Sequence, residues 1–142
     1  MKDSRFGVNV LLTIVVGVAL WATLRRFSAG PWRPIQTVGA CLLVVGFVFW
    51  TVARFQLGAS LTVSAQARKL VTRGLYSKIR NPIYVFGSCV IAGIILIAGR
   101  PVWLLLFLLI IPLQIWRAKK ESAVLESAFG DDYRSYRAKT WF

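Results

Sequence analysis

The sequence predicts an all-α integral membrane protein with about four transmembrane helices, the last two a short helical hairpin, and a cytoplasmic amphipathic C-terminal helix. Three observations support this fold class. Of the 142 residues, 57% are hydrophobic, which is more than a soluble domain of this length usually contains. The apolar residues are gathered into blocks, which favours membrane spans over a soluble core. Positively charged residues flank the blocks, as they do at the ends of membrane helices.

The first two apolar blocks, 6–24 and 35–55, are each long enough to cross a bilayer. The first block has 19 residues and no charge, and a crossing α-helix needs roughly 20 apolar residues. Because no small-residue cleavage site follows it, we expect this block to remain as a span and not to be removed as a signal peptide. Trp21, Trp32 and Trp50 lie near the block ends, where the membrane interface favours indole rings.

The third and fourth blocks, 83–98 and 102–116, are shorter and are joined by a tight turn. As helices they would be about 24 Å long, less than the ~30 Å hydrocarbon core, so we expect a hairpin that barely crosses. Gly87 and Gly93 would let a neighbouring helix approach closely. Pro112 should kink the fourth helix, because proline lacks a backbone donor.

Four spans place both termini and the segment 58–82 on one side of the membrane, and the length allows a single domain, 1–142. Of the 18 Lys and Arg residues, 14 then lie on that side and four on the other. The positive-inside rule therefore predicts cytoplasmic N- and C-termini. The short chain favours the bacterial inner membrane over the endoplasmic reticulum. Membrane lipids are the expected partners of these cations.

Composition also argues against several classes of function. The net charge is +13, but it flanks apolar segments and forms no soluble basic domain, so we expect no nucleic-acid partner. The chain contains no His, which excludes a Ser-His-Asp triad. Cys41 and Cys89 lie inside apolar blocks without the spacing of metal ligands, so we expect no metal site. The oligomeric state cannot be read from the sequence.

The most informative segment is 69–87, KLVTRGLYSKIRNPIYVFG, which is basic, turn-rich and placed between two spans. The tail, 117–142, is its acidic counterpart, because it holds four of the five Asp and Glu residues. The tail pattern predicts an amphipathic helix ending near Gly130. If the loop and tail meet at one membrane surface, cations and N–H groups can hold a carboxylate, while carboxylates and aromatic rings can hold a positive centre. Such a pocket suits a ligand with both charges.

Each of these residues also has a simpler structural interpretation. Asn81 followed by Pro82 is a favoured start of a helix. Tyr84, like Tyr76, could be an anchor at the membrane interface. Glu121 could pair with a cation one helical turn earlier. Only the joint pattern favours a functional site.

Two segments resemble the signatures of the isoprenylcysteine carboxyl methyltransferases and the related phospholipid methyltransferases. The loop LVTRGLYSKIRNPIYVFG resembles the family's LVTxGxYxxxRHPxYxG, and ESAVLESAFGDDYRSYR in the tail resembles EExxLxxxFGxxYxxY. The two lie in the expected order, separated by the expected hairpin, and cover roughly half of the chain. Two positions depart from the pattern: Asn81 stands where His is usual, and Ser122 where a second acid is common. Asn keeps a donor and an acceptor but carries no charge.

The resemblance implies an integral membrane enzyme that uses S-adenosylmethionine to methylate a lipophilic acceptor entering from the bilayer. The first candidate acceptor is an isoprenylcysteine-like carboxylate, and a phospholipid or another small lipophile is the alternative. A non-enzymatic membrane protein that keeps the fold and binds lipid or a partner is a further alternative. A sterol-reductase-type enzyme shares an RHP-like signature, but this chain is short for its spans and has no GxGxxG.

The resemblance also assigns roles to residues by their motif positions. Arg80, Arg117 and Glu121 are the expected catalytic residues: the arginines would orient a carboxylate acceptor, and Glu121 would lie near the cofactor's amino group. The residues expected to bind the cofactor are Lys69, Leu70, Val71, Gly74, Tyr76, Arg80, Asn81, Tyr84 and Glu121.

Overall fold

The computed structural model describes residues 2–27, 31, 33–57 and 70–141, and its regular elements are helical. No strand occurs in these ranges, although Ile79 and Trp141 form one isolated parallel bridge. The predicted all-α class is therefore confirmed. Lys69 and the part of the segment 58–82 that precedes it lie outside the described residues. The elements are α1 (Lys2–Phe27), α2 (Pro34–Leu57), the 3₁₀ turn η2 (Gly74–Ser77), α3 (Pro82–Ile97), the 3₁₀ turn η3 (Pro101–Leu106) and α4 (Phe107–Ala138).

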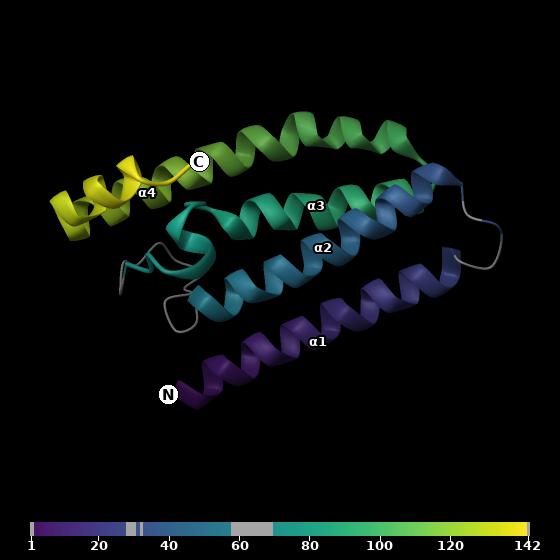
Figure 1. Cartoon of the computed structure of the whole chain (residues 1–142), viewed down its shortest axis with the longest axis horizontal. Coiled ribbons are helices and arrows are strands. Elements are labelled where there is room, and N and C mark those ends of the chain that lie inside the picture. The colour runs from purple at the N-terminus through teal and green to yellow at the C-terminus, as the bar shows by residue number, and fades with distance from the viewer. Residues whose placement is uncertain (1, 28–30, 32, 58–69, 142) are drawn as a thin grey trace.

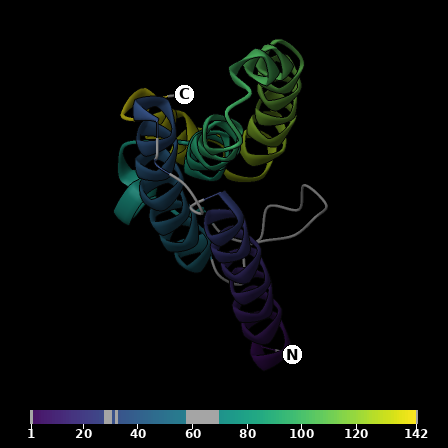
Figure 2. The same ribbon diagram turned by 90° about the vertical axis from the view of Figure 1, so that its right-hand side faces the viewer.

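The four long helices run alternately in opposite directions, so their ends gather at two ends of the molecule (Figure 1). One end of the molecule, which we call the site end, holds the start of α1, the end of α2, the start of α3 and the end of α4. Seen along the bundle, α1 diverges from the other helices toward its N-terminus (Figure 2). This arrangement brings the loop before α3 and the C-terminal tail to the same end of the molecule.

Among the described residues, two helical stretches are long and apolar enough to cross a membrane, Pro34–Leu57 and Pro101–Ala138. Two shorter apolar helices accompany them, Val10–Arg25 and Pro82–Ile97. Large apolar side chains on the outside are exposed, as at Leu109 on α4, 73% of whose surface is open. The number of spans stays a prediction, although each of the four predicted blocks falls on helical backbone.

Three tryptophans hold a cation from one helical turn further along the chain above their rings. These pairs are Arg25 over Trp21, Arg54 over Trp50 and Lys120 over Trp116, at 4.9, 4.9 and 3.8 Å from the ring centroid. Indole rings and snorkelling cations favour the membrane–water interface. Trp21 lies toward the end of the bundle opposite the site end, and the other two lie toward the site end. Trp32 lies outside the described residues.

Glycines allow α2 and α3 to pack closely along their length. A methyl group added at Gly93 would lie 2.7 Å from the Gly39 carbonyl oxygen and 2.8 Å from Leu43 Cβ. One added at Gly46 would lie 2.9 Å from Cys89 Cβ. The close approach predicted at Gly93 is therefore confirmed. Gly87, by contrast, makes only an ordinary contact with a tryptophan ring, 3.7 Å from its added methyl.

The core of the bundle lies where α1, α2 and α3 meet. Leu20 from α1, Leu43 from α2 and Ile97 from α3 are all buried there. Ile97 and Leu43 are only 1% and 2% exposed. The α2–α3 pair therefore forms the rigid part of the molecule, and it carries the start of α3 at the site end.

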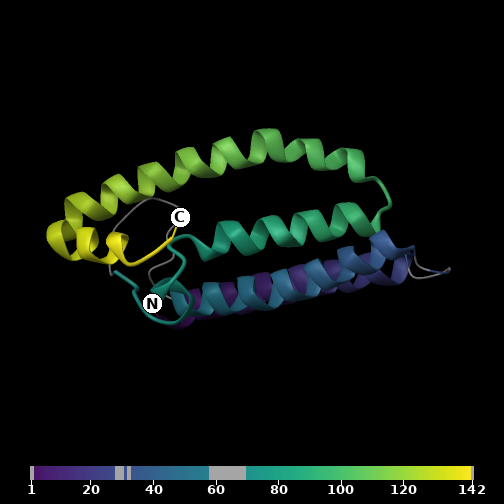
Figure 3. The same ribbon diagram turned by 45° about the horizontal axis from the view of Figure 1, so that its top comes forward.

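α4 differs in extent from the predicted fourth span and tail. The turn η3 occupies the start of the predicted span, and one helix then continues through Pro112 and past Arg117 into the tail. No glycine or proline interrupts the chain between Pro112 and Gly130, so nothing ends the helix at the edge of the apolar block. Gly130, with φ 50°, does interrupt the helical path, as the sequence predicts. Figure 3 shows α4 as a bowed helix whose last segment turns back toward the loop.

Gly93→Ala should lower the stability of the folded protein, because the added methyl group has no space between α2 and α3. Overpacking of this kind costs about 1–3 kcal/mol. We expect a lower thermal unfolding temperature in detergent. Gly7→Ala is the matched control, since a methyl group there meets nothing within 4 Å. Equal unfolding temperatures for both variants would contradict the close α2–α3 packing.

Candidate functional site

The loop enters the site through the turn η2, which α2 holds in place. The Leu75 N–H donates to Gln56 Oε1 at 2.8 Å. Gly74 has φ 65°, and a Cβ at this position would overlap the Gln56 side chain. Only glycine therefore fits this turn. Leu70 and Val71, two of the predicted cofactor residues, are half-buried in the extended segment that leads into it.

The tail docks on the loop through hydrogen bonds to the backbone. The Tyr136 hydroxyl donates to the Tyr76 carbonyl oxygen at 2.8 Å, and both side chains are buried. The Arg80 N–H donates to the Trp141 carbonyl at 2.9 Å, and the Trp141 N–H donates to the Lys78 carbonyl at 2.8 Å. The end of the chain thus fixes the backbone immediately before the RNP segment. The expected meeting of loop and tail at one end of the molecule is confirmed.

A short hydrogen bond joins the start of α3 to the tail segment of α4. The Tyr84 hydroxyl donates to Glu121 Oε1 at 2.5 Å, and both residues are half-buried. Arg117, one helical turn before Glu121, is exposed and acts electrostatically on the Tyr84 hydroxyl. The simpler expectation of an ion pair between Glu121 and Arg117 is not met within the described part of the chain, because the carboxylate turns to Tyr84.

Other tail acids hold the tail itself together. Arg134 bonds Glu126 at 2.9 Å and Asp131 at 3.2 Å, and Arg137 lies 3.8 Å from Glu126. Glu126 lies before the break at Gly130, and both arginines lie after it. These ion pairs therefore fasten the turned-back segment to the main part of α4. Glu121 is left as the acid that faces the loop and α3.

Asn81 occupies the capping position of α3, but its side chain does not cap the helix. The backbone carbonyl of Asn81 accepts from the N–H groups of Tyr84 and Val85 at 3.1 and 3.3 Å, and Pro82 occupies the first turn. The predicted helix start is therefore confirmed in its backbone only. The side chain is available for another role.

Three buried polar atoms of the loop and the tail have no hydrogen-bond partner among the described residues. They are Nε of Arg80, Nδ2 of Asn81 and the hydroxyl oxygen of Tyr133. Tyr133 is fully buried. An unpartnered buried polar atom costs about 1–3 kcal/mol, so such a group indicates a ligand or water. Two of the three are donors on the loop, and the third comes from the tail.

Burial raises the pKa of the tyrosines that join the tail to the loop. The pKa of Tyr136 is raised to about 12, chiefly by burial and then by the neighbouring Tyr133 hydroxyl. The pKa of Tyr76 is raised well above its usual value by burial, and then by Tyr136 and Glu121. Both hydroxyls therefore stay protonated through the neutral range, and Tyr136 remains a hydrogen-bond donor.

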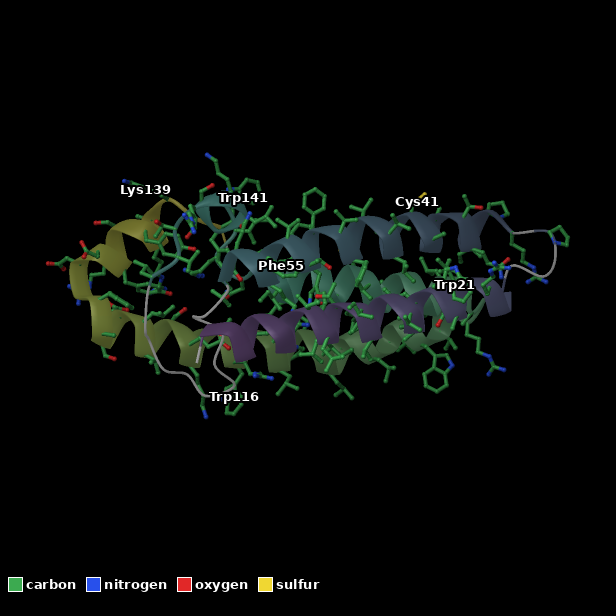
Figure 4. The ribbon with its side chains drawn as sticks, turned by 90° about the horizontal axis from the view of Figure 1, so that it is seen from below. Trp21, Cys41, Phe55, Trp116, Lys139 and Trp141 are labelled. Atoms are coloured by element: carbon green, nitrogen blue, oxygen red, sulfur yellow. The ribbon has the colours of Figure 1, made fainter. Side chains whose placement is uncertain are left out.

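Four residues that shape the site were not predicted from the sequence. Tyr133 and Tyr136 matched the tail signature, but no role at the site was predicted for them. Gln56 and Trp141 carry no motif, and Trp141 acts through its backbone. Figure 4 shows Trp141, Lys139 and Phe55 toward the site end, with Trp21 and Cys41 toward the other end.

A shallow groove of about 480 Å³ lies beside the site, between the end of α2 and η2. Thr51, Phe55 and Arg73 line it together with Gly74. Of the predicted cofactor residues that the structure describes, only Gly74 lines this groove. Tyr84, Glu121, Arg80 and Asn81 do not line it, so it is separate from the polar site formed by the loop and the tail.

The chain is similar to a known family and to a known protein over most of its length. The family model described as phospholipid methyltransferase matches residues 35–132. A protein-S-isoprenylcysteine O-methyltransferase from Schizosaccharomyces pombe is 34% identical over 114 residues, which cover 73% of this chain and 47% of that protein. The chain therefore spans about half the length of the curated relative it matches. The family match runs from the start of α2 through Tyr84 and Glu121 into the tail.

Alkaline pH should loosen the docking of the tail through Tyr136. A tyrosine ionises near pH 10 in an unfolded chain, whereas Tyr136 in the folded protein does so at about 12. Its contribution to stability is therefore full below pH 10 and is lost as the pH rises toward 12, because only the unfolded state loses the proton in that window. We expect the thermal unfolding temperature to fall across this window.

Tyr136→Phe should lower the unfolding temperature at neutral pH, since a hydrogen bond of about 0.5–1.5 kcal/mol is lost. It should also flatten the alkaline decline. Tyr133→Phe removes a hydroxyl without a partner and should not lower the neutral unfolding temperature. If the Tyr136→Phe profile ran parallel to that of the wild type, the alkaline loss would belong to other groups.

Proposed function

This chain belongs to the phospholipid methyltransferase family, and we propose that it transfers a methyl group from S-adenosylmethionine to a lipophilic acceptor. The observation that carries the proposal is the Tyr84–Glu121 hydrogen bond, which joins the two segments that bear the family's signatures. The acceptor enters from the bilayer, and the polar site lies at the cytoplasmic face. The excess of Lys and Arg at the site end supports this orientation. The bacterial inner membrane is the proposed location.

The residues at the site end fit the chemistry of the cofactor. Its amino-acid end carries one carboxylate and one ammonium group. The unpartnered donors of Arg80 and Asn81 suit the carboxylate, and Glu121, oriented by Tyr84, suits the ammonium group. The tail covers this position from the other side, where the Tyr133 hydroxyl offers a further polar contact. When bound, the cofactor supplies a methyl group already activated by its sulfonium charge.

Little acid–base chemistry is then required of the protein. An in-line methyl transfer needs the acceptor atom held about 3–3.5 Å from the methyl carbon, so the main task is positioning. A carboxylate acceptor is ionised at neutral pH and needs no base. Arg117 lies beside Tyr84 and is exposed, so it can draw such a carboxylate to the site. An isoprenylcysteine-like carboxylate is therefore the first candidate acceptor.

A phospholipid amine is the second candidate, and the description of the matching family favours it. An amine must lose a proton before it can accept a methyl group, so this reaction needs a base or water near the acceptor. The carboxylate of Glu121 already accepts a hydrogen bond from Tyr84 and would face the cofactor. The cationic side chains at the site therefore favour the carboxylate acceptor over the amine.

Glu121→Ala should weaken the binding of S-adenosylhomocysteine at least several-fold, and about tenfold if one charge-assisted hydrogen bond is lost. The measurement is calorimetric titration into protein in detergent, with folding checked by thermal unfolding. Asp132→Ala is the matched control, because that tail acid is exposed and takes part in none of the tail ion pairs described above. It should leave the affinity unchanged.

Equal affinity in the Glu121 variant and the wild type would remove Glu121 from the cofactor site. Methyl transfer from labelled S-adenosylmethionine then separates the candidate acceptors. We expect label in the methyl ester of a farnesylated cysteine and none in phosphatidylethanolamine. The reverse result would make the phospholipid amine the acceptor. Cofactor binding without transfer to any lipophile would favour a non-enzymatic role.

A further inference from the structure

A second polar contact joins α3 to α4, deeper in the bundle than the Tyr84–Glu121 bond. The Ser88 hydroxyl lies 3.2 Å from Gln114 Oε1 and 3.1 Å from Gln114 Nε2, and both residues are half-buried. The pair is set in apolar stretches of both helices. Polar side chains are costly at membrane depth and usually mark packing contacts or functional sites. A packing contact and a functional site can be distinguished by asking whether every donor and acceptor of the side-chain amide already has a partner.

Gln36 shows what a glutamine does when it only links two helices. Its Nε2 donates to the Ile97 carbonyl of α3 at 3.0 Å, and its Oε1 accepts from the Arg33 N–H at 2.9 Å. Both ends of this amide therefore have a partner. Gln36 is half-buried at the end of the bundle opposite the site end.

Gln114 is different, because both ends of its amide meet the same hydroxyl. A hydroxyl has one hydrogen to donate, whereas a primary amide offers two N–H groups and two acceptor lone pairs. Ser88 can donate to Gln114 Oε1 and accept from one Nε2 hydrogen, but it cannot also serve the second N–H of the amide. In the described part of the chain this second N–H has no further side-chain or backbone partner. A hydrogen-bonding group is thus left available between two membrane helices.

The position of this pair relates it to the polar site. Ser88 follows Tyr84 by one turn of α3, a rise of about 6 Å. Gln114 precedes Glu121 by two turns of α4, and the small, buried Ala118 lies between them. α3 and α4 make few close backbone contacts, whereas α2 and α3 pack along their length. The two polar contacts therefore lie at two depths of one loosely packed helix pair.

We propose that Ser88 and Gln114 form a specificity site for the methyl acceptor. They select a lipophile that carries a neutral hydrogen-bonding group, such as an amide carbonyl, in addition to the group that is methylated. Gln114 Nε2 donates to that carbonyl. Ser88 is a positioning residue, because its hydroxyl donates to Gln114 Oε1 and turns the amide N–H toward the acceptor. This site would serve the methyltransferase function proposed above and defines its substrate class.

The test compares two acceptors that differ only in the hydrogen-bonding group. N-acetyl-S-farnesylcysteine carries an amide next to its carboxylate, and S-farnesyl-3-mercaptopropionate lacks it. We expect wild-type kcat/KM to favour the amide-bearing acceptor about tenfold, the effect of one hydrogen bond. Gln114→Leu should lower this preference to about one, and Ser88→Ala to about threefold. Both variants should bind S-adenosylhomocysteine as the wild type does.

Gln36→Leu is the matched control, because it also removes a half-buried amide that links two helices. It should lower the unfolding temperature and leave the acceptor preference at about tenfold. The proposal is overturned if Gln114→Leu keeps the tenfold preference, or if Gln36→Leu loses it to the same extent. In that case the Ser88–Gln114 contact would be a packing contact alone.

A binding measurement keeps this test independent of turnover. Both acceptors are titrated into wild type and Gln114→Leu in nanodiscs with S-adenosylhomocysteine present. Tighter binding of the amide-bearing acceptor by the wild type alone supports the specificity site, even if no methyl transfer occurs. Equal binding of both acceptors by the wild type overturns it. Failure to bind S-adenosylhomocysteine would count against the methyltransferase function, while the acceptor ratio would still decide on Ser88 and Gln114.

Discussion

The hydrogen bond from Tyr84 to Glu121 is the interaction on which the site depends. It joins α3, which belongs to the rigid α2–α3 pair, to α4, which packs loosely against it. The bond also orients the Glu121 carboxylate toward α3. Glu126 and Asp131, by contrast, form their ion pairs within the tail. A charge held in this way is available to a cationic ligand without further ordering, and preorganisation of this kind favours binding.

The tail contributes in a second way, by closing over the loop. Tyr136 bonds the Tyr76 backbone, and Trp141 pairs with the strand-like residues on either side of Ile79. These contacts use backbone groups of the loop, so they leave the side chains of Arg80 and Asn81 available. The unpartnered atoms of those side chains are therefore a product of how the loop is held. The loop and the tail are therefore held together by several hydrogen bonds, whereas α3 and α4 pack loosely against each other. This combination suits a water-soluble cofactor and an acceptor from lipid.

Much of this architecture could be predicted from the sequence, because membrane helices are encoded by long apolar blocks and glycines mark close helix contacts. The RNP segment and the tail signature predicted Tyr84, Arg80 and Glu121 as site residues, and the structure brings Tyr84 and Glu121 into contact. The continuity of α4 could not be predicted from hydropathy, since the helix crosses from an apolar to a polar segment without a breaker. The roles of Gln56 and Trp141 could not be predicted from the sequence, because each depends on a hydrogen bond to a backbone group that is distant in sequence. The partner of Glu121 was also open, since helical spacing favours Arg117 equally well.

The central claim is that the loop and tail together form a site for S-adenosylmethionine. Calorimetric titration of S-adenosylhomocysteine into the folded protein in nanodiscs, with NADPH as the comparison ligand, tests it most directly. We expect micromolar binding of the sulfur compound, one molecule per chain, and no binding of NADPH. Absence of S-adenosylhomocysteine binding in protein that unfolds cooperatively would contradict the claim. The Tyr84–Glu121 bond would then be a structural link between α3 and α4 and not part of a cofactor site.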